Sequence, residues 1–106
     1  MSEEDYIDAL NEDELKEDSM KLTKVAGRDV LMTRHDGQVY GVSNKCPHMG
    51  CSLANGKLDG YLVVCPCHSW AFDVRTGEYT KAKGFQLMTY ECRIYDGKVQ
   101  VKILDF

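Results

Sequence analysis

The sequence predicts a small all-β domain, built as an antiparallel sandwich or barrel. Short apolar runs recur along the 106 residues and are separated by glycine-containing turns, a pattern typical of all-β domains. Asp-Gly dipeptides at Asp36-Gly37 and Asp96-Gly97 stand between such runs and favour tight hairpins. A chain of this length forms one domain with a modest core.

The first half of the chain has the pattern of a meander of short strands. Strands are expected at residues 6–9, 20–25, 30–34 and 39–43. Between the first two, Asn11 and Glu14 have the spacing of a capping box, which predicts one helical turn ending near Lys16. The fourth strand leads to Cys46.

The second half of the chain continues the pattern and ends in a hairpin. A strand at residues 61–64 leads into Cys65, residues 72–77 form a strand end and a glycine turn, and residues 79–84 form a polar loop. The last hairpin turns at Asp96-Gly97. Its predicted cross-strand pairs, all on the core face at period two, are Ile94 with Val99, Cys92 with Val101 and Tyr90 with Ile103.

Charge divides the chain into two parts. Residues 1–18 hold nine acids and one Lys, whereas residues 19–106 hold eight acids and twelve basic residues, within a total of −4. We therefore expect an acidic lead-in with a short first strand at 1–18, followed by the main domain at 19–106. The lead-in is either a solvated segment or a field that steers a redox partner.

No apolar run approaches the length that spans a bilayer, and the N-terminus lacks a basic-then-apolar signal. These absences predict a soluble, cytoplasmic protein with no membrane span and no nucleic-acid partner.

Two cysteine–histidine boxes carry the chemistry. Cys46 and His48 are separated by one proline, Cys65 and His68 by two residues, and sixteen residues lie between the boxes. Thiolate and imidazole together suit zinc, iron or an iron–sulfur cluster. Zinc pairs usually leave two to four residues between ligands, whereas two Cys and two His at this spacing match the ligands of a Rieske [2Fe–2S] centre. His35 has no cysteine near it in sequence and is expected at the surface.

Beyond the ligands, residues 56–60 (Gly-Lys-Leu-Asp-Gly), Phe72-Asp73 and Thr76-Gly77 complete the pattern. With these motifs the chain resembles the Rieske ferredoxins and their relatives over about residues 20–104. The resemblance implies a Rieske-type β-sandwich or barrel in which two hairpin loops bind a [2Fe–2S] cluster. It implies that Cys46 and Cys65 bind the inner iron, and that His48 and His68 bind the outer, surface-facing iron.

The residues around the boxes are candidates for tuning the cluster through hydrogen bonds and burial. They are Met49, Gly50, Leu53, Pro66, Ser69, Trp70 and Phe72. Backbone N–H groups near Met49 and Gly50 can point at cluster sulfurs, and Leu53 is expected to exclude water. High-potential relatives of the cytochrome bc type carry hydroxyl side chains where this chain has Trp70 and Phe72. The resemblance therefore implies a potential in the lower part of the Rieske range.

The remaining cysteines have different expected roles. By resemblance to the bc-type proteins, Cys51 and Cys67 form a disulfide that ties the two loops together. Many oxygenase ferredoxins lack both cysteines, so the chain combines features of two subfamilies. Cys92 lies on the core face of the last hairpin and is expected to be a buried thiol.

The resemblance implies a monomeric one-electron carrier that is not itself an enzyme. It would take electrons from a flavin-containing reductase and pass them to a terminal acceptor, most simply an oxygenase. Three alternatives remain open at this point: a Rieske subunit of a larger oxidoreductase complex, a zinc-binding interaction module, and a redox sensor that works through Cys51 and Cys67.

Overall fold

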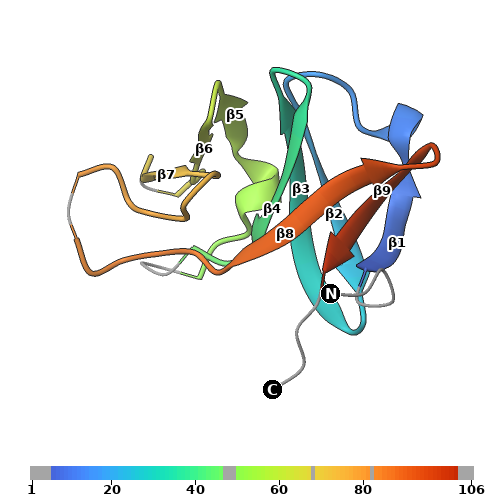
Figure 1. Cartoon of the computed structure of the whole chain (residues 1–106). Helices are drawn as coiled ribbons and strands as arrows, with labels where there is room; N and C mark the ends of the chain where they lie inside the picture. Colours follow the sequence, from blue (N-terminus) through green and yellow to red (C-terminus); the bar gives the residue numbers. More distant parts are fainter. Residues whose placement is uncertain (1–5, 47–49, 68, 82, 103–106) are drawn as a thin grey trace.

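The chain forms two antiparallel sheets joined side by side (Figure 1). The computed structural model describes residues 6–46, 50–67, 69–81 and 83–102. The larger sheet has the strand order β1-β9-β8-β4-β3-β2, and the smaller has the order β5-β6-β7. Within the described ranges, no helix is long and apolar enough to cross a membrane.

The strands are joined by hairpins, loops and two short 3₁₀ turns. In chain order the elements are β1 (Tyr6–Asn11), η2 (Glu12–Glu14), β2 (Ser19–Val25), β3 (Arg28–His35), β4 (Gln38–Ser43), η3 (Leu53–Asn55), β5 (Lys57–Asp59), β6 (Leu62–Val64), β7 (Ala71–Asp73), β8 (Thr89–Tyr95) and β9 (Lys98–Lys102). The all-β prediction is therefore confirmed.

The larger sheet curls until its two edge strands, β1 and β2, contact each other, so it encloses a barrel-like core. The residues of this barrel core are Leu10, Leu15, Val25, Val30, Met32, Val39, Val99 and Val101. Cys92, Ile94 and Tyr90 pack against it from β8, which agrees with the core face predicted for the last hairpin.

A second core lies between the two sheets. Its buried residues are Leu31, Val42, Cys46, Leu53, Val63, Cys65, Phe72, Val74 and Leu87. Strand β3 serves both cores, because side chains alternate across a strand: Val30 and Met32 belong to the barrel core and Leu31 to the second. The smaller sheet is therefore fixed to the barrel through apolar contacts that include two cysteines of the boxes.

The local sequence signals match the structure closely. The capping box at Asn11 and Glu14 is present, and the turn that it opens ends at Glu14. The hairpins at residues 36–37 and 96–97 both have positive φ at their Asp and Gly, as the two-residue turn requires. Cys92 pairs with Val101 and Ile94 with Val99; Ile103 lies outside the described residues.

The described part of the acidic segment, residues 6–18, is built into the barrel. β1 pairs with β9 along most of its length, and Leu15, just after the 3₁₀ turn, is fully buried in the barrel core. The guanidinium of Arg34 donates to the carbonyl oxygen of Leu15 at 3.1 Å. We propose that this segment folds together with the barrel.

Replacing Leu15 with Ala tests that proposal. Removing a fully buried leucine side chain leaves a cavity, so the free energy of unfolding should fall by about 2–5 kcal/mol. Ile7→Ala on the same segment is the control, because Ile7 is 37% exposed and its loss should cost less than about 1 kcal/mol. Urea denaturation measures the free energy of unfolding of both variants. Equal, small losses would show that the segment does not fold together with the barrel.

Candidate metal centre

The two boxes fold into the same backbone turn. In the first, the N–H of Cys46 donates to the carbonyl oxygen of Cys51 at 3.0 Å, and the N–H of Gly50 donates to the carbonyl oxygen of Cys46 at 2.7 Å. In the second, Cys65 donates to Trp70 at 2.7 Å and Ser69 donates to Cys65 at 3.0 Å. A cysteine thus opens each turn, and the residue five positions later closes it.

The fourth residue after each cysteine adopts a left-handed backbone. Gly50 has φ of 74° and Ser69 has φ of 60°. Glycine takes this conformation without steric cost, whereas a non-glycine residue there is uncommon. Ser69, one of the candidates for tuning the cluster, has the place in the second turn that Gly50 has in the first.

The first cysteine of each box is buried, and the two share one core. Cys46 and Cys65 are each 1% exposed and belong to the core between the sheets. Leu53 and Phe72, both fully buried, belong to the same core; that Leu53 shields a metal centre stays a prediction. Two buried thiols presented by matched turns are the donor set that one iron of a [2Fe–2S] cluster requires.

Several predicted site residues lie outside the described residues. These are His48, His68 and Met49, so the two imidazole ligands remain a prediction from the sequence. Of the remaining candidates, Gly50, Pro66 and Ser69 are exposed, and Trp70 is partly buried against the second core.

A disulfide joins the two turns, as the sequence predicted. Cys51 and Cys67 are bonded, with their Cα atoms 6.5 Å apart. The sulfur of Cys65 lies within 4.8 Å of both disulfide sulfurs. The bond therefore holds the two boxes together next to a proposed ligand. The structure does not join Cys46, Cys65 or Cys92 in any disulfide.

The roles of two residues that position the boxes were not predicted from the sequence, although one of them, Gly56, belongs to the motif at residues 56–60. Asn44 organises the first loop: its side chain donates to the hydroxyl of Ser52 at 2.8 Å and accepts the N–H of Ala54 at 2.9 Å. Gly56 allows a close approach, since a Cβ there would collide with the carbonyl oxygen of Val64 and lie 3.2 Å from Cδ of Pro66. Asparagine near a turn is too common to have singled out Asn44.

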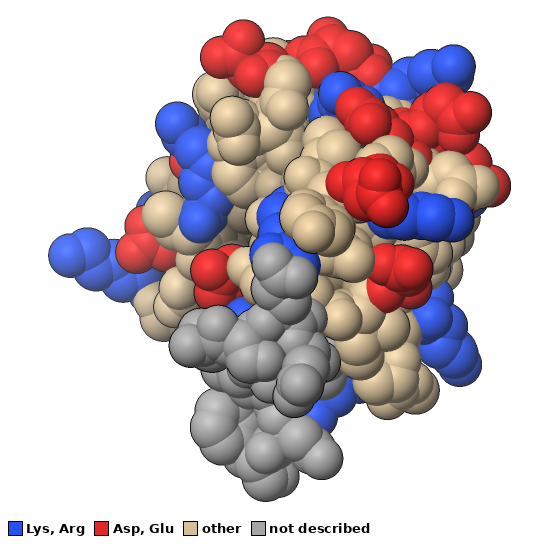
Figure 2. Space-filling view, turned by 45° about the vertical axis from the view of Figure 1, so that its right-hand side comes forward, with Lys and Arg blue, Asp and Glu red and all other residues tan. Residues whose placement is uncertain are grey.

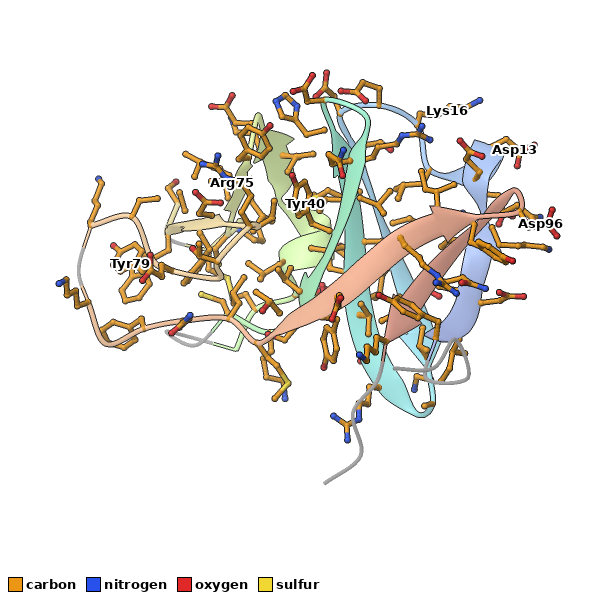
Figure 3. All side chains as sticks on the ribbon, in the orientation of Figure 1. Asp13, Lys16, Tyr40, Arg75, Tyr79 and Asp96 are labelled. Atoms are coloured by element: carbon orange, nitrogen blue, oxygen red, sulfur yellow. A yellow bond between two sulfur atoms is a disulfide. The ribbon has the colours of Figure 1, made fainter. Side chains whose placement is uncertain are left out.

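An aromatic cluster covers the second box. The ring of Trp70 stacks on that of Tyr79 with centroids 4.1 Å apart, and the ring of Phe85 meets Trp70 edge-on at 5.0 Å. The N–H of Tyr79 also donates to the carbonyl oxygen of Phe85 at 3.2 Å. The rings of Trp70 and Phe85 therefore hold Tyr79, which lies at the start of the proline-free loop at residues 79–84 (Figure 3).

Charged and aromatic groups fasten the turn after β7. The carboxylate of Asp73 accepts the backbone N–H of Arg75 at 2.9 Å and two guanidinium hydrogen bonds at 3.0 and 2.8 Å. These bonds from Arg75 lower the pKa of Asp73. The guanidinium also lies 4.0 Å over the ring of Tyr61. The motif at residues 72–77 is thus structural.

His35 is also explained by packing. Its ring meets Tyr61 edge-on at 4.5 Å, and its Nδ1 lies 2.5 Å from a carboxylate oxygen of Asp18. Its side chain is only 26% exposed, less than the surface position predicted. No contact of this ring with the cysteine turns occurs in the described structure.

Comparison with known proteins identifies the family. The Rieske [2Fe-2S] domain family matches residues 5–91. The ferredoxin component of the naphthalene 1,2-dioxygenase/salicylate 5-hydroxylase systems of Ralstonia sp. is 30% identical over 105 residues, which is 94% of this chain and 97% of that protein.

Solved structures of ferredoxins have the same fold as this chain. The ferredoxin of carbazole 1,9a-dioxygenase from Nocardioides aromaticivorans superimposes with a TM-score of 0.84 at 27% identity, covering 91% of this chain and 95% of that one. A chain in the complex of reduced oxygenase and oxidized ferredoxin of carbazole 1,9a-dioxygenase superimposes with a TM-score of 0.82 at 26% identity, covering 94% and 97%. The chain therefore belongs to the Rieske [2Fe-2S] domain family, and its prosthetic group is a [2Fe–2S] cluster.

Proposed function

We propose that this protein is a diffusible, monomeric one-electron carrier that takes electrons from a flavin-containing reductase and passes them to an oxygenase. The observation that carries the proposal is the pair of matched turns that bury Cys46 and Cys65 in one core and are tied by a disulfide. Relatives that are ferredoxin components of oxygenase systems support the direction of transfer. A carrier of this kind works in the cytoplasm beside its reductase.

The proposed ligands are Cys46 and Cys65 for one iron and His48 and His68 for the other. The bound cluster supplies a single electron that is gained and lost reversibly. Each box contributes one thiolate and one imidazole. The chain's task is therefore to hold four donor atoms from two distant segments in a constant arrangement.

The apolar residues beside the buried cysteines lower the local polarity. Leu53, Val63 and Phe72 are fully buried in the same core as Cys46 and Cys65. They keep water from the thiolate side, so charge on that side is screened less than in solvent. This favours placing the exchanged electron on the side of the imidazole ligands, which are neutral.

The disulfide and the shared core restrain the two turns as one unit. The Cys51–Cys67 bond joins the loops, and Leu53 of the first loop packs in the same core as Phe72 of the second. A rigid donor set changes little between oxidation states, which suits fast electron exchange.

The side chains at positions 70 and 72 lack hydroxyl groups. Phe72 is fully buried in the core that contains both cysteines. Because its phenyl ring has no hydroxyl, it cannot donate a hydrogen bond to their sulfurs. Hydrogen bonds to cluster sulfurs raise the potential. We therefore place the potential in the lower part of the Rieske range of about −150 to +300 mV.

Replacing the proposed imidazole ligands should abolish the Rieske centre. His48→Ala or His68→Ala should lose the electron paramagnetic resonance signal and most bound iron and sulfide, because each removes a ligand of one iron. The matched control is His35→Gln, whose ring contacts Tyr61 and Asp18 instead and should leave cluster content unchanged. Full cluster content in either ligand variant would contradict the assignment.

Adding a hydroxyl beside the cysteines should raise the reduction potential. In Phe72→Tyr, a hydroxyl that donates to a cysteine sulfur favours the reduced form, and a hydrogen bond of about 1 kcal/mol corresponds to about 40 mV for one electron. Phe85→Tyr is the control, because that ring is 41% exposed and should leave the potential unchanged. Potentiometric titration decides; equal potentials in Phe72→Tyr and wild type would remove this explanation.

Alkylation should divide the five cysteines into three classes: the buried thiol Cys92, the proposed ligands Cys46 and Cys65, and the disulfide pair Cys51 and Cys67. Burial raises the pKa of Cys92 to about 12, so at pH 8 the native thiol is almost entirely protonated and reacts slowly. Its labelling rate should rise about tenfold per pH unit, because the thiolate fraction grows in that proportion below the pKa.

After denaturation without reductant, mass spectrometry should find label on Cys46, Cys65 and Cys92, which the structure leaves outside any disulfide. Cys51 and Cys67 should become reactive only after reduction. Label on both before reduction would show that the bridge is absent.

A further inference from the structure

The charge of the protein is separated between its two ends. Residues 44–88, which carry both boxes and the smaller sheet, hold five basic and three acidic residues, a net of +2. The whole chain has a charge of −4, and the other residues that the structure describes, 6–43 and 89–102, include ten acidic and eight basic residues, a net of −2. The cluster-binding part is therefore positive in a protein that is negative overall.

The acidic charge gathers around η2. Glu12, Asp13 and Glu17 line a groove there together with Arg34 and Lys16. Figure 2, which brings the β1 and η2 side forward, shows acidic side chains crowded over the upper part of the molecule. In Figure 3, Asp13 and Asp96 lie at the end of the molecule opposite Tyr79. The negative end thus points away from the boxes.

Four lysines at the cluster end are exposed; Lys45 and Lys57 stand apart in the sequence, whereas Lys81 and Lys83 lie on one loop. The carboxylate of Asp73 is occupied by Arg75 at 2.8 Å, which cancels both charges. Lys81 and Lys83 are exposed, and no acid occurs between residues 79 and 88. These two lysines line a hollow of about 480 Å³ with Tyr79, Phe85 and one exposed acid, Glu78.

The same loop exposes apolar side chains that are held in place. Phe85 is 41% exposed and Met88 is 58% exposed, the largest exposure among the large apolar residues described. Phe85 is fixed against Trp70 of the second box. Both backbone groups of Met88 are bonded to Ser43, at 2.8 and 3.2 Å. We name Lys81, Lys83, Phe85 and Met88, the exposed basic and large apolar residues of segment 79–88, the loop patch.

We propose that the loop patch is the docking surface for the redox partner, and that the partner presents an acidic surface with an apolar centre. The two lysines match acidic groups, while Phe85 and Met88 supply the apolar contact area that protein interfaces concentrate at their centres. The proposal rests on the proposed carrier function and adds the chemistry of the partner's face.

The separation of charge would also orient the protein during approach. An acidic partner attracts the loop patch and repels the η2 end, so the encounter brings the second box forward. Steering of this kind raises association rates by about 10–10³-fold and weakens as salt screens the charges.

Voltammetry at charged electrodes tests this with the full-length, cluster-loaded protein. Gold electrodes carry monolayers ending in carboxylate, hydroxyl or ammonium groups, and the carboxylate surface represents the acidic partner. At low ionic strength the electron-transfer rate should be about tenfold higher on carboxylate than on ammonium. This difference should shrink as salt is added.

Matched variants separate a docking surface from net charge. Lys81→Glu/Lys83→Glu should lose the preference for carboxylate. Lys16→Glu/Lys98→Glu changes the net charge equally but lies at the η2 end, on the groove and on the neighbouring hairpin, and should keep it. Equal loss in both double variants, or a faster rate on ammonium, would overturn the proposal.

A mixed carboxylate and methyl monolayer tests the apolar part of the patch. The wild-type rate should exceed that on pure carboxylate, and Met88→Gln should remove the gain; a gain that survives in Met88→Gln would exclude that residue from the patch. Failure of the carrier function gives a different result: no reversible one-electron wave would then appear on any surface, including the neutral hydroxyl one.

Discussion

The structure depends on bringing two cysteine turns from distant parts of the chain into one buried core. Cys46 follows the barrel strand β4, while Cys65 follows β6 of the smaller sheet. Both side chains belong to one core that also contains Leu31 of the barrel. The energy that holds the metal centre is therefore the burial of ordinary apolar side chains between the sheets, supplemented by the Cys51–Cys67 bond.

The remaining architecture supports this junction. Strand β3 is buried on both faces, so one strand packs in the barrel core and in the core between the sheets. Gly56 permits its backbone to lie close to Val64, which draws the first loop onto the strand that leads to Cys65. The stacked rings of Trp70 and Tyr79 close the loop over the second box. Charge then distinguishes the end that carries the boxes from the end that does not.

Local signals made much of this predictable from the sequence. The Asp-Gly turns, the capping box and period-two alternation act over few residues, and each reappears in the structure. The spacing of cysteine and histidine likewise predicted the family, and the resemblance to bc-type proteins implied the disulfide. The roles of Ser69, Asn44 and Tyr79 were not predictable, because they depend on contacts between loops that have no fixed sequence spacing. Burial of Leu15 was hidden for the same reason, since an acidic segment surrounds it.

The most direct test of the account is electron paramagnetic resonance of the full-length protein during a potentiometric titration. The account predicts a reduced-state Rieske signal that appears in one reversible one-electron step, with a midpoint in the lower part of the range of about −150 to +300 mV. A colourless protein that contains one zinc ion and gives no signal would contradict the central claim. A signal with its midpoint near the top of the range would instead contradict the role given to positions 70 and 72.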